Sequence, residues 1–250
     1  MKKAKYFLSA MLMAACFTQP AKAQFEGSIT YESTDYTSVS NEDDDSFTLH
    51  LTPDRMLLEG DKSYNFLESI KTEGVLVRLD KEDFVFLTGG EQALKISKTD
   101  ITSMMNLFNG GQDVTQQADN VDITQKRTGE TKDIQGFQAD EFIFKNNDEN
   151  ENKHFAVWMT RDIDVNWGML AEPWDDADQL ISSTDFPVDL VFKEKYFPLR
   201  FESYEDDELK SVLEATKIDK GPVDTDKMQV PAGVNVLSMQ NYLFQKLSEN

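Results

Sequence analysis

The side chains best suited to catalysis are scarce in this chain. It has one cysteine, Cys16, and two histidines, His50 and His154. No Gly-x-Ser-x-Gly elbow occurs, and no phosphate-binding glycine-rich loop that ends in Lys-Ser or Lys-Thr. A serine triad needs a histidine beside a serine and an aspartate, and the local sequence of neither histidine indicates one. We therefore predict a protein that is not an enzyme and has no catalytic residues.

Acidic side chains are abundant, so calcium is the metal that this composition could best bind. Calcium takes oxygen ligands only, whereas zinc prefers cysteine and histidine. Acidic runs lie at residues 43–45, 148–151, 175–178 and 205–208. None has the spacing of a calcium loop with its central glycine and closing glutamate. We interpret the runs as solvated turns and faces, and predict no metal and no cofactor.

The first 23 residues have the layout of a secretory signal peptide. Lys2, Lys3 and Lys5 precede an apolar run at residues 6–17, and the segment ends in a small-x-small site at Ala23. That run is shorter than the roughly 20 apolar residues that span a bilayer. We expect cleavage after Ala23, a periplasmic or secreted protein, and no transmembrane segment afterwards. An alternative is a lipoprotein box at residues 13–16, which would place a lipid on Cys16.

The remaining chain is strongly acidic. Residues 1–23 hold four lysines and no acid, so residues 24–250 have 21 basic and 46 acidic residues, a formal charge of −25. Binding to nucleic acid or to anionic lipid surfaces depends on basic side chains, so this charge argues against both, and we predict no nucleic-acid partner. A basic protein partner remains compatible with this charge.

Alternation of apolar and polar residues predicts antiparallel strands, and these strands would hold any binding site in place. This alternation occurs at residues 25–32, 47–52 and 75–79, whereas residues 84–87 are apolar on both faces, as expected for a central or covered strand. Further strands are predicted at residues 93–96, 121–124, 140–145 and 154–160. Residues 188–191, 199–202 and 212–218 are also predicted as strands. We expect one domain over residues 24–250, mainly β with a few helices. Its architecture would be a curved antiparallel sheet, or incomplete barrel, wrapped around helices.

Helical spacing interrupts this pattern and supplies the candidate ligand-binding residues. Ile101, Met104, Met105 and Phe108 fall on one stripe of a helix that Thr99 or Asp100 could cap. A second helix is predicted over residues 170–181 and a short one near the C-terminus. Trp158 and Trp174 could line a pocket with the first stripe, or could simply join a hairpin to its helix.

Several segments resemble a secreted bacterial family, the domain of unknown function 4412. They lie at residues 25–31, 134–142, 157–163, 198–201 and 230–233, in the family's order. The resemblance implies a fold like the outer-membrane lipoprotein carriers LolA and LolB, an incomplete barrel with an apolar concavity. It implies no activity and no site residues.

These observations favour a secreted binding protein that holds an apolar or amphipathic ligand, such as a lipid acyl chain, in the concave face of the sheet. Methionine suits such a site because its side chain is flexible. A protein-interaction module with a packed core and an acidic surface is the second hypothesis. A calcium-dependent hydrolase is the least favoured.

Overall fold

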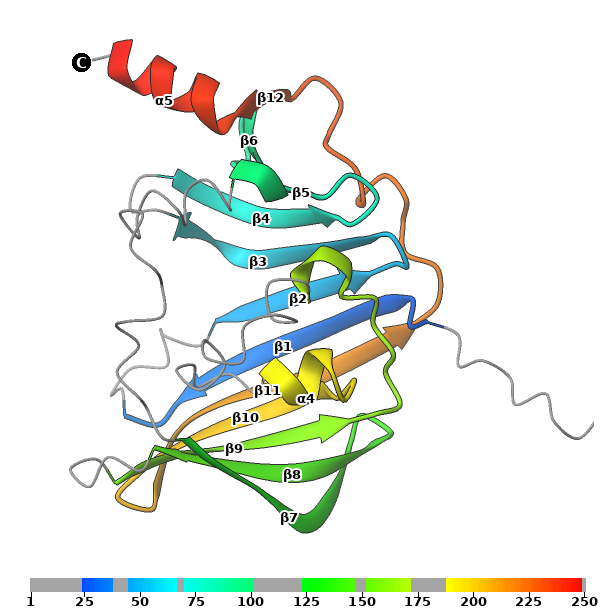
Figure 1. The fold of residues 1–250 in the computed structure, drawn as a ribbon, viewed down its shortest axis with the longest axis vertical. Coiled ribbons are helices and arrows are strands. Elements are labelled where there is room, and N and C mark those ends of the chain that lie inside the picture. The colour runs from blue at the N-terminus through cyan, green and yellow to red at the C-terminus, as the bar shows by residue number, and fades with distance from the viewer. Residues whose placement is uncertain are drawn as a thin grey trace, which may run out of the picture.

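A computed structural model describes residues 24–37, 45–66, 70–100, 123–146, 152–171 and 188–248. These residues form one open, curved sheet of twelve strands, drawn from top to bottom in Figure 1 in the order β12-β6-β5-β4-β3-β2-β1-β11-β10-β9-β8-β7. The strands are β1 (Gly27–Asp35), β2 (Ser46–Leu51), β3 (Arg55–Phe66), β4 (Ile70–Arg78), β5 (Asp83–Leu87), β6 (Gln92–Ser97), β7 (Ile123–Ile134), β8 (Phe137–Asn146), β9 (Lys153–Thr160), β10 (Phe197–Glu205), β11 (Glu208–Lys220) and β12 (Asn235–Ser238). The helices with both ends among the described residues are η3 (Gly168–Leu170), α4 (Val188–Phe192) and α5 (Met239–Ser248).

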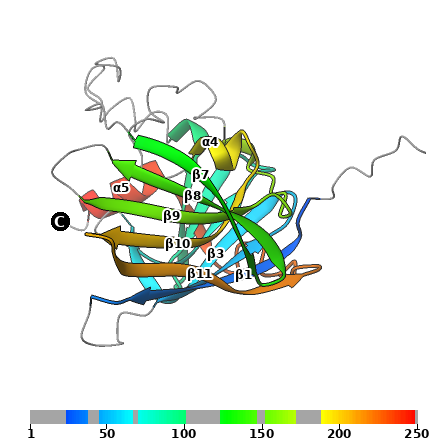
Figure 2. The same ribbon diagram turned by 90° about the horizontal axis from the view of Figure 1, so that it is seen from below.

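The sheet consists of two antiparallel meanders joined side by side. Strands β1 to β6 are neighbours in chain order, as are β7 to β11, and β1 pairs with β11 to join the two groups. Of the strands that the structure describes, only β12 runs parallel to its neighbour, β6. The view from below shows the strong twist of the β7 end (Figure 2). The predicted class, a mainly β protein with a curved antiparallel sheet and few helices, is confirmed.

The register aligns side chains of one kind into rows across the strands. On one face, here called the inner face, Ile29, Leu49, Leu58 and Val75 are paired in turn from β1 to β4. The opposite, outer face carries Leu57, Leu76 and Val85 among others, because successive side chains of a strand point to opposite sides.

Each face is covered by a different part of the chain. In Figure 1, α4 and the segment containing η3 lie in front of the sheet. Met169 of η3 joins the core cluster of the inner face, and Leu190 and Val191 of α4 pack with residues of β8 and β9. On the outer face, residues 221–234, here called the strap, bring buried Met228 against Leu57 and Leu76. Within the described residues, no helix combines the length and the hydropathy needed to cross a bilayer.

One strand prediction is wrong. Residues 188–191 were predicted as a strand, and they form the helix α4. A segment as short as Val-Asp-Leu-Val, with one acidic and three apolar residues, does not distinguish a strand from a partly buried helical turn. In the structure, Leu190 and Val191 are both buried in the cluster under β8 and β9, and Lys193 pairs with Asp189 one turn earlier.

The predicted helix after β6 begins earlier than expected. Residues 98–100 are helical, and Ser97 rather than Thr99 or Asp100 is the cap. The Ser97 amide and hydroxyl donate to Asp100 at 2.8 and 2.6 Å, and the Asp100 amide donates back to Ser97 Oγ, which is a reciprocal capping box. Residues 1–23 and most of the helix predicted at 170–181 lie outside the described residues.

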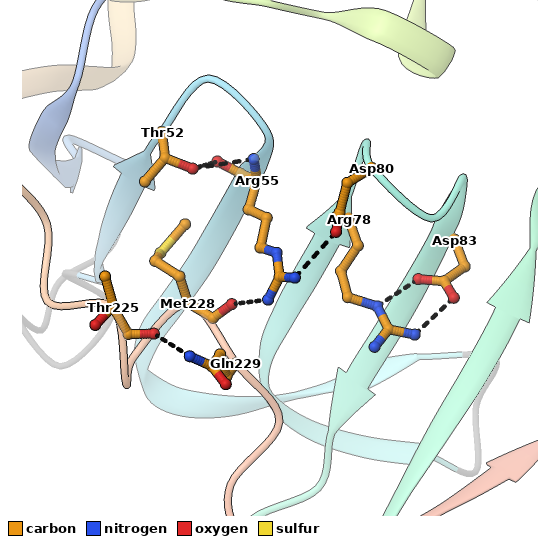
Figure 3. A network of polar contacts seen from close by, with 8 residues as sticks. All are labelled: Thr52, Arg55, Arg78, Asp80, Asp83, Thr225, Met228 and Gln229. Carbon is orange, nitrogen blue, oxygen red and sulfur yellow. Dashed lines mark hydrogen bonds and ion pairs between the residues drawn. The ribbon is translucent and has the colours of Figure 1, made fainter.

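A cross-strand ion pair on β4 and β5 generates a stability prediction. Arg78 donates from Nε and Nη2 to the two oxygens of Asp83, both at 2.6 Å, and the Asp83 side chain is 7% exposed (Figure 3). Asp83→Asn leaves the buried guanidinium uncompensated, so we expect a loss of about 3 kcal/mol in the free energy of unfolding, measured by urea denaturation.

The control is Glu194→Gln, which breaks the pair of Arg161 and Glu194. Both side chains of that pair are about half exposed, and the expected loss is below about 1 kcal/mol. Equal effects of the two substitutions would contradict the role given to the buried pair.

Candidate functional site

The inner face carries a strip of apolar side chains that the described residues leave partly uncovered. The strip comprises Phe47, Leu49, Leu58 and Val75, on β2, β3 and β4. Leu58 is 38% exposed and the other three are half-buried. We call this set the inner strip.

Neighbouring residues explain why the inner strip is more exposed to solvent than the rest of the inner face. One row toward η3, Leu51 and Met56 are almost fully buried, and they belong to the cluster that contains Met169. At the other side, Gly60 is the partner of Phe47 and adds no side chain. Phe47 stacks on Tyr31 at 5.1 Å between ring centroids, so one of its ring faces is covered.

The chemistry of the inner strip is purely apolar. Its side chains have no hydrogen-bonding group, and the nearby Tyr31 hydroxyl already donates to the carbonyl of Pro198 at 2.7 Å. Burial raises the pKa of this hydroxyl far above its ordinary value of 10.0, so it stays neutral. The inner strip can therefore bind an apolar group by burial alone.

Of the six candidate ligand-binding residues predicted from the sequence, one is described. Ile101, Met104, Met105, Phe108 and Trp174 lie outside the described residues. Trp158 is on β9 and contacts the core cluster that contains Met169. These residues therefore stay a prediction.

Trp158 does not lie at the inner strip. Five strand spacings, about 24 Å along the sheet, separate β9 from β3. Trp158 is paired with Glu141 and Arg200, while the adjacent Val157 and Met159 point to the other side, under α4. Its indole Nε1 is buried and has no hydrogen-bond partner among the described residues, and the ammonium of Lys132 lies 5.7 Å from its ring centroid.

The outer face carries two shallow hollows beside the strap. One, of about 280 Å³, lies over Gly74 between Glu59 and Leu87, where the cross-strand row lacks a side chain. A Cβ at Gly74 would lie 2.9 Å from the Leu58 carbonyl oxygen, so a glycine is needed there. The other hollow, of about 310 Å³, is lined by Ser28, His50 and Lys227 among others.

A three-residue polar cluster lies between the two hollows and ties the strap to the sheet. Glu59 Oε2 is 2.9 Å from His50 Nε2 and accepts from Lys227 Nζ at 3.0 Å. Arg55 adds a second tie by donating to the Met228 carbonyl at 2.7 Å while it pairs with Asp80 (Figure 3). Sequence reasoning missed this cluster, because Glu59 and Lys227 are 168 residues apart and no local pattern links them.

The second histidine has a structural contact of its own. The His154 ring stacks on Tyr204 with 4.7 Å between centroids. Burial is the main cause that lowers the pKa of His154 from its ordinary value of 6.5. Among the described residues, no three His, Cys, Asp or Glu side chains are grouped to hold a metal ion.

One known protein family matches most of this chain. The family model of the domain of unknown function 4412 (DUF4412) matches residues 56–234. The chain belongs to this family. Four segments that suggested DUF4412 from the sequence lie inside the match, whereas residues 25–31 precede it. The DUF4412 region includes Leu58 and Val75 of the inner strip, the whole strap, and Glu59.

Similar solved structures are remote. Two structures of PNGF-II are each 14% identical, and each alignment covers 89% of this chain. The alignments cover 32% and 33% of those chains, with TM-scores of 0.47 and 0.45, so this chain spans about a third of their length. A LolA superfamily protein, NE2245 from Nitrosomonas europaea, is 8% identical, with 89% of this chain and 97% of that chain covered at a TM-score of 0.26. No curated protein matches.

The cluster of Glu59, His50 and Lys227 predicts a dependence of stability on pH. Burial raises the pKa of Glu59, but hydrogen bonds from Lys227 and His50, with their charges, outweigh it and lower the pKa below its ordinary 4.5. A carboxyl with a lowered pKa stabilises the fold above that ordinary value, and the contribution is lost as the pH falls through the folded-state pKa. We expect the urea midpoint of the wild type to fall more than that of Glu59→Gln between about pH 5 and about pH 3. Parallel pH profiles of the two proteins would contradict this role of Glu59.

Proposed function

We propose that this protein is a secreted, non-enzymatic binding protein that holds an apolar or amphipathic ligand, such as a lipid acyl chain, against the inner face of its sheet. The observation that carries the proposal is the inner strip. Contiguous apolar side chains that stay accessible on a folded protein mark interaction sites.

A ligand can gain free energy by burying the exposed part of the inner strip. Full burial of a leucine or phenylalanine side chain is worth about 2 kcal/mol relative to full exposure. In the protein alone, the side chains of the inner strip gain only part of this burial free energy, because they are half-buried or exposed. A ligand that covers them gains the remainder, and an extended acyl chain fits a row of side chains that crosses several strands.

The proposal assigns no chemical step to the protein. His50 is hydrogen-bonded to Glu59 in a cluster that anchors the strap, and His154 is stacked on Tyr204. Export is part of the proposal because of the predicted signal peptide at residues 1–23. The sheet is open, so a long apolar ligand could enter along the inner face rather than through a closed mouth.

The test combines native ligand detection with a matched pair of variants. We expect solvent extraction of protein purified from its native host to release lipid that mass spectrometry detects, and the emptied protein to enhance the fluorescence of an apolar dye. Leu58→Asp places a charge in the strip, and we expect the dissociation constant of the dye to rise at least tenfold, which is about 1.4 kcal/mol. Its circular dichroism should match that of the wild type, because Leu58 is 38% exposed.

The control is Tyr36→Asp, the same kind of substitution at a side chain that is 59% exposed and lies beyond the end of β1. It should leave dye binding unchanged. A native protein without lipid, whose extracted form also fails to enhance the dye, would remove the proposal.

A further inference from the structure

One end of the sheet differs in charge from the rest of the molecule. Residues 227–248 contain no aspartate or glutamate, and this is the longest such run in residues 24–250. The run carries only two charges, on Lys227 and Lys246. It ends with β12 and α5, which lie together at the top of the sheet in Figure 1. We call β12 and α5, residues 235–248, the acid-free end.

The two edge strands of the sheet are built differently. Edge strands that must not associate are commonly protected by charges and bulges. Strand β7 has both, since Lys126, Arg127 and Lys132 are exposed and its pairing with β8 is irregular between Arg127 and Thr131. Strand β12 has four uncharged residues, and among the described residues no strand pairs with its other side.

Exposed apolar side chains gather at the same end. Among the described residues, the large apolar side chains classed as exposed are Tyr36, Leu58, Val236 and Phe244. Two of these four belong to the acid-free end, with Val236 37% exposed on β12 and Phe244 72% exposed on α5. The opposite side of α5 is engaged, because Met239 and Tyr242 pack on Leu94 and Ile96 of β6.

We propose that the acid-free end is a contact surface for a second copy of this chain. Residues 24–250 carry a charge of −25, so two copies repel each other wherever acidic surfaces meet. They can approach at the acid-free end, which presents the same uncharged strand and the same phenylalanine on both copies. Such a self-complementary contact is what a two-fold symmetric dimer requires.

Charge also argues against other occupants of this end. A basic protein would be attracted to the acidic remainder of the molecule rather than to the acid-free end. An anionic membrane would repel a body of this charge. This inference rests on β12 and α5 and does not depend on the proposed ligand of the inner strip.

The test is the association state of the protein spanning residues 24–250, measured by sedimentation velocity over a range of concentrations. We expect a monomer–dimer equilibrium in which dimerisation strengthens between about 0.05 and about 0.5 M NaCl, because salt screens the repulsion between the two bodies. Phe244→Asp should lower the association constant at least tenfold. Tyr36→Asp, which adds the same charge at another exposed aromatic residue, should change it much less.

Val236→Lys serves as a second variant if Phe244→Asp melts at a lower temperature than the wild type, and it should also weaken the dimer. The proposal is overturned if the wild type is a monomer at every concentration and salt level, or if salt weakens the dimer. It is overturned equally if Phe244→Asp and Val236→Lys dimerise like the wild type, or if monomeric protein instead sediments with phosphatidylcholine vesicles.

Discussion

A long open sheet has two faces, and each face must be covered by other parts of the chain or must be polar. Twelve strands in aligned register create rows of side chains that run across the sheet, and the period of two separates the inner rows from the outer ones. A closed barrel would bury its inner rows against one another. Here the chain must supply separate covers, and those within the described residues leave the inner strip partly exposed.

The covers are attached by different forces. On the outer face, Met228 of the strap is buried with Leu57 and Leu76, while polar ties from Arg55 and Glu59 fix its position. On the inner face, α4 and η3 are attached mainly by apolar packing, as in the contact of Trp167 with Phe192 and Phe197. The strap is thus held by apolar burial and by polar contacts together, whereas apolar packing predominates at α4 and η3.

The sequence predicts the elements of this fold better than their arrangement. Alternation identifies β2, because Phe47, Leu49 and Leu51 share one face of this strand. The continuous apolar run at residues 84–87 identifies β5, whose two faces both meet buried residues. Neither pattern reveals that β1 pairs with β11, since that contact joins residues nearly two hundred positions apart. The strand predicted at residues 188–191 is wrong because four residues are too few for a period of two to be told from a helical turn. The sequence predicts an apolar ligand site on the concave face, but it does not predict which residues form the inner strip. Leu49 and Leu58 become neighbours only when β2 and β3 pair in their register.

We expect an apolar ligand to contact the inner face at the four side chains of the inner strip, Phe47, Leu49, Leu58 and Val75. Photolabelling of the emptied protein with a diazirine-bearing fatty acid, followed by peptide mass spectrometry, tests this most directly. We expect labels at inner-face positions of β2, β3 and β4, and we expect an excess of unlabelled fatty acid to suppress them. Labels confined to the strap and the outer face, or labels that the competitor does not suppress, would contradict it.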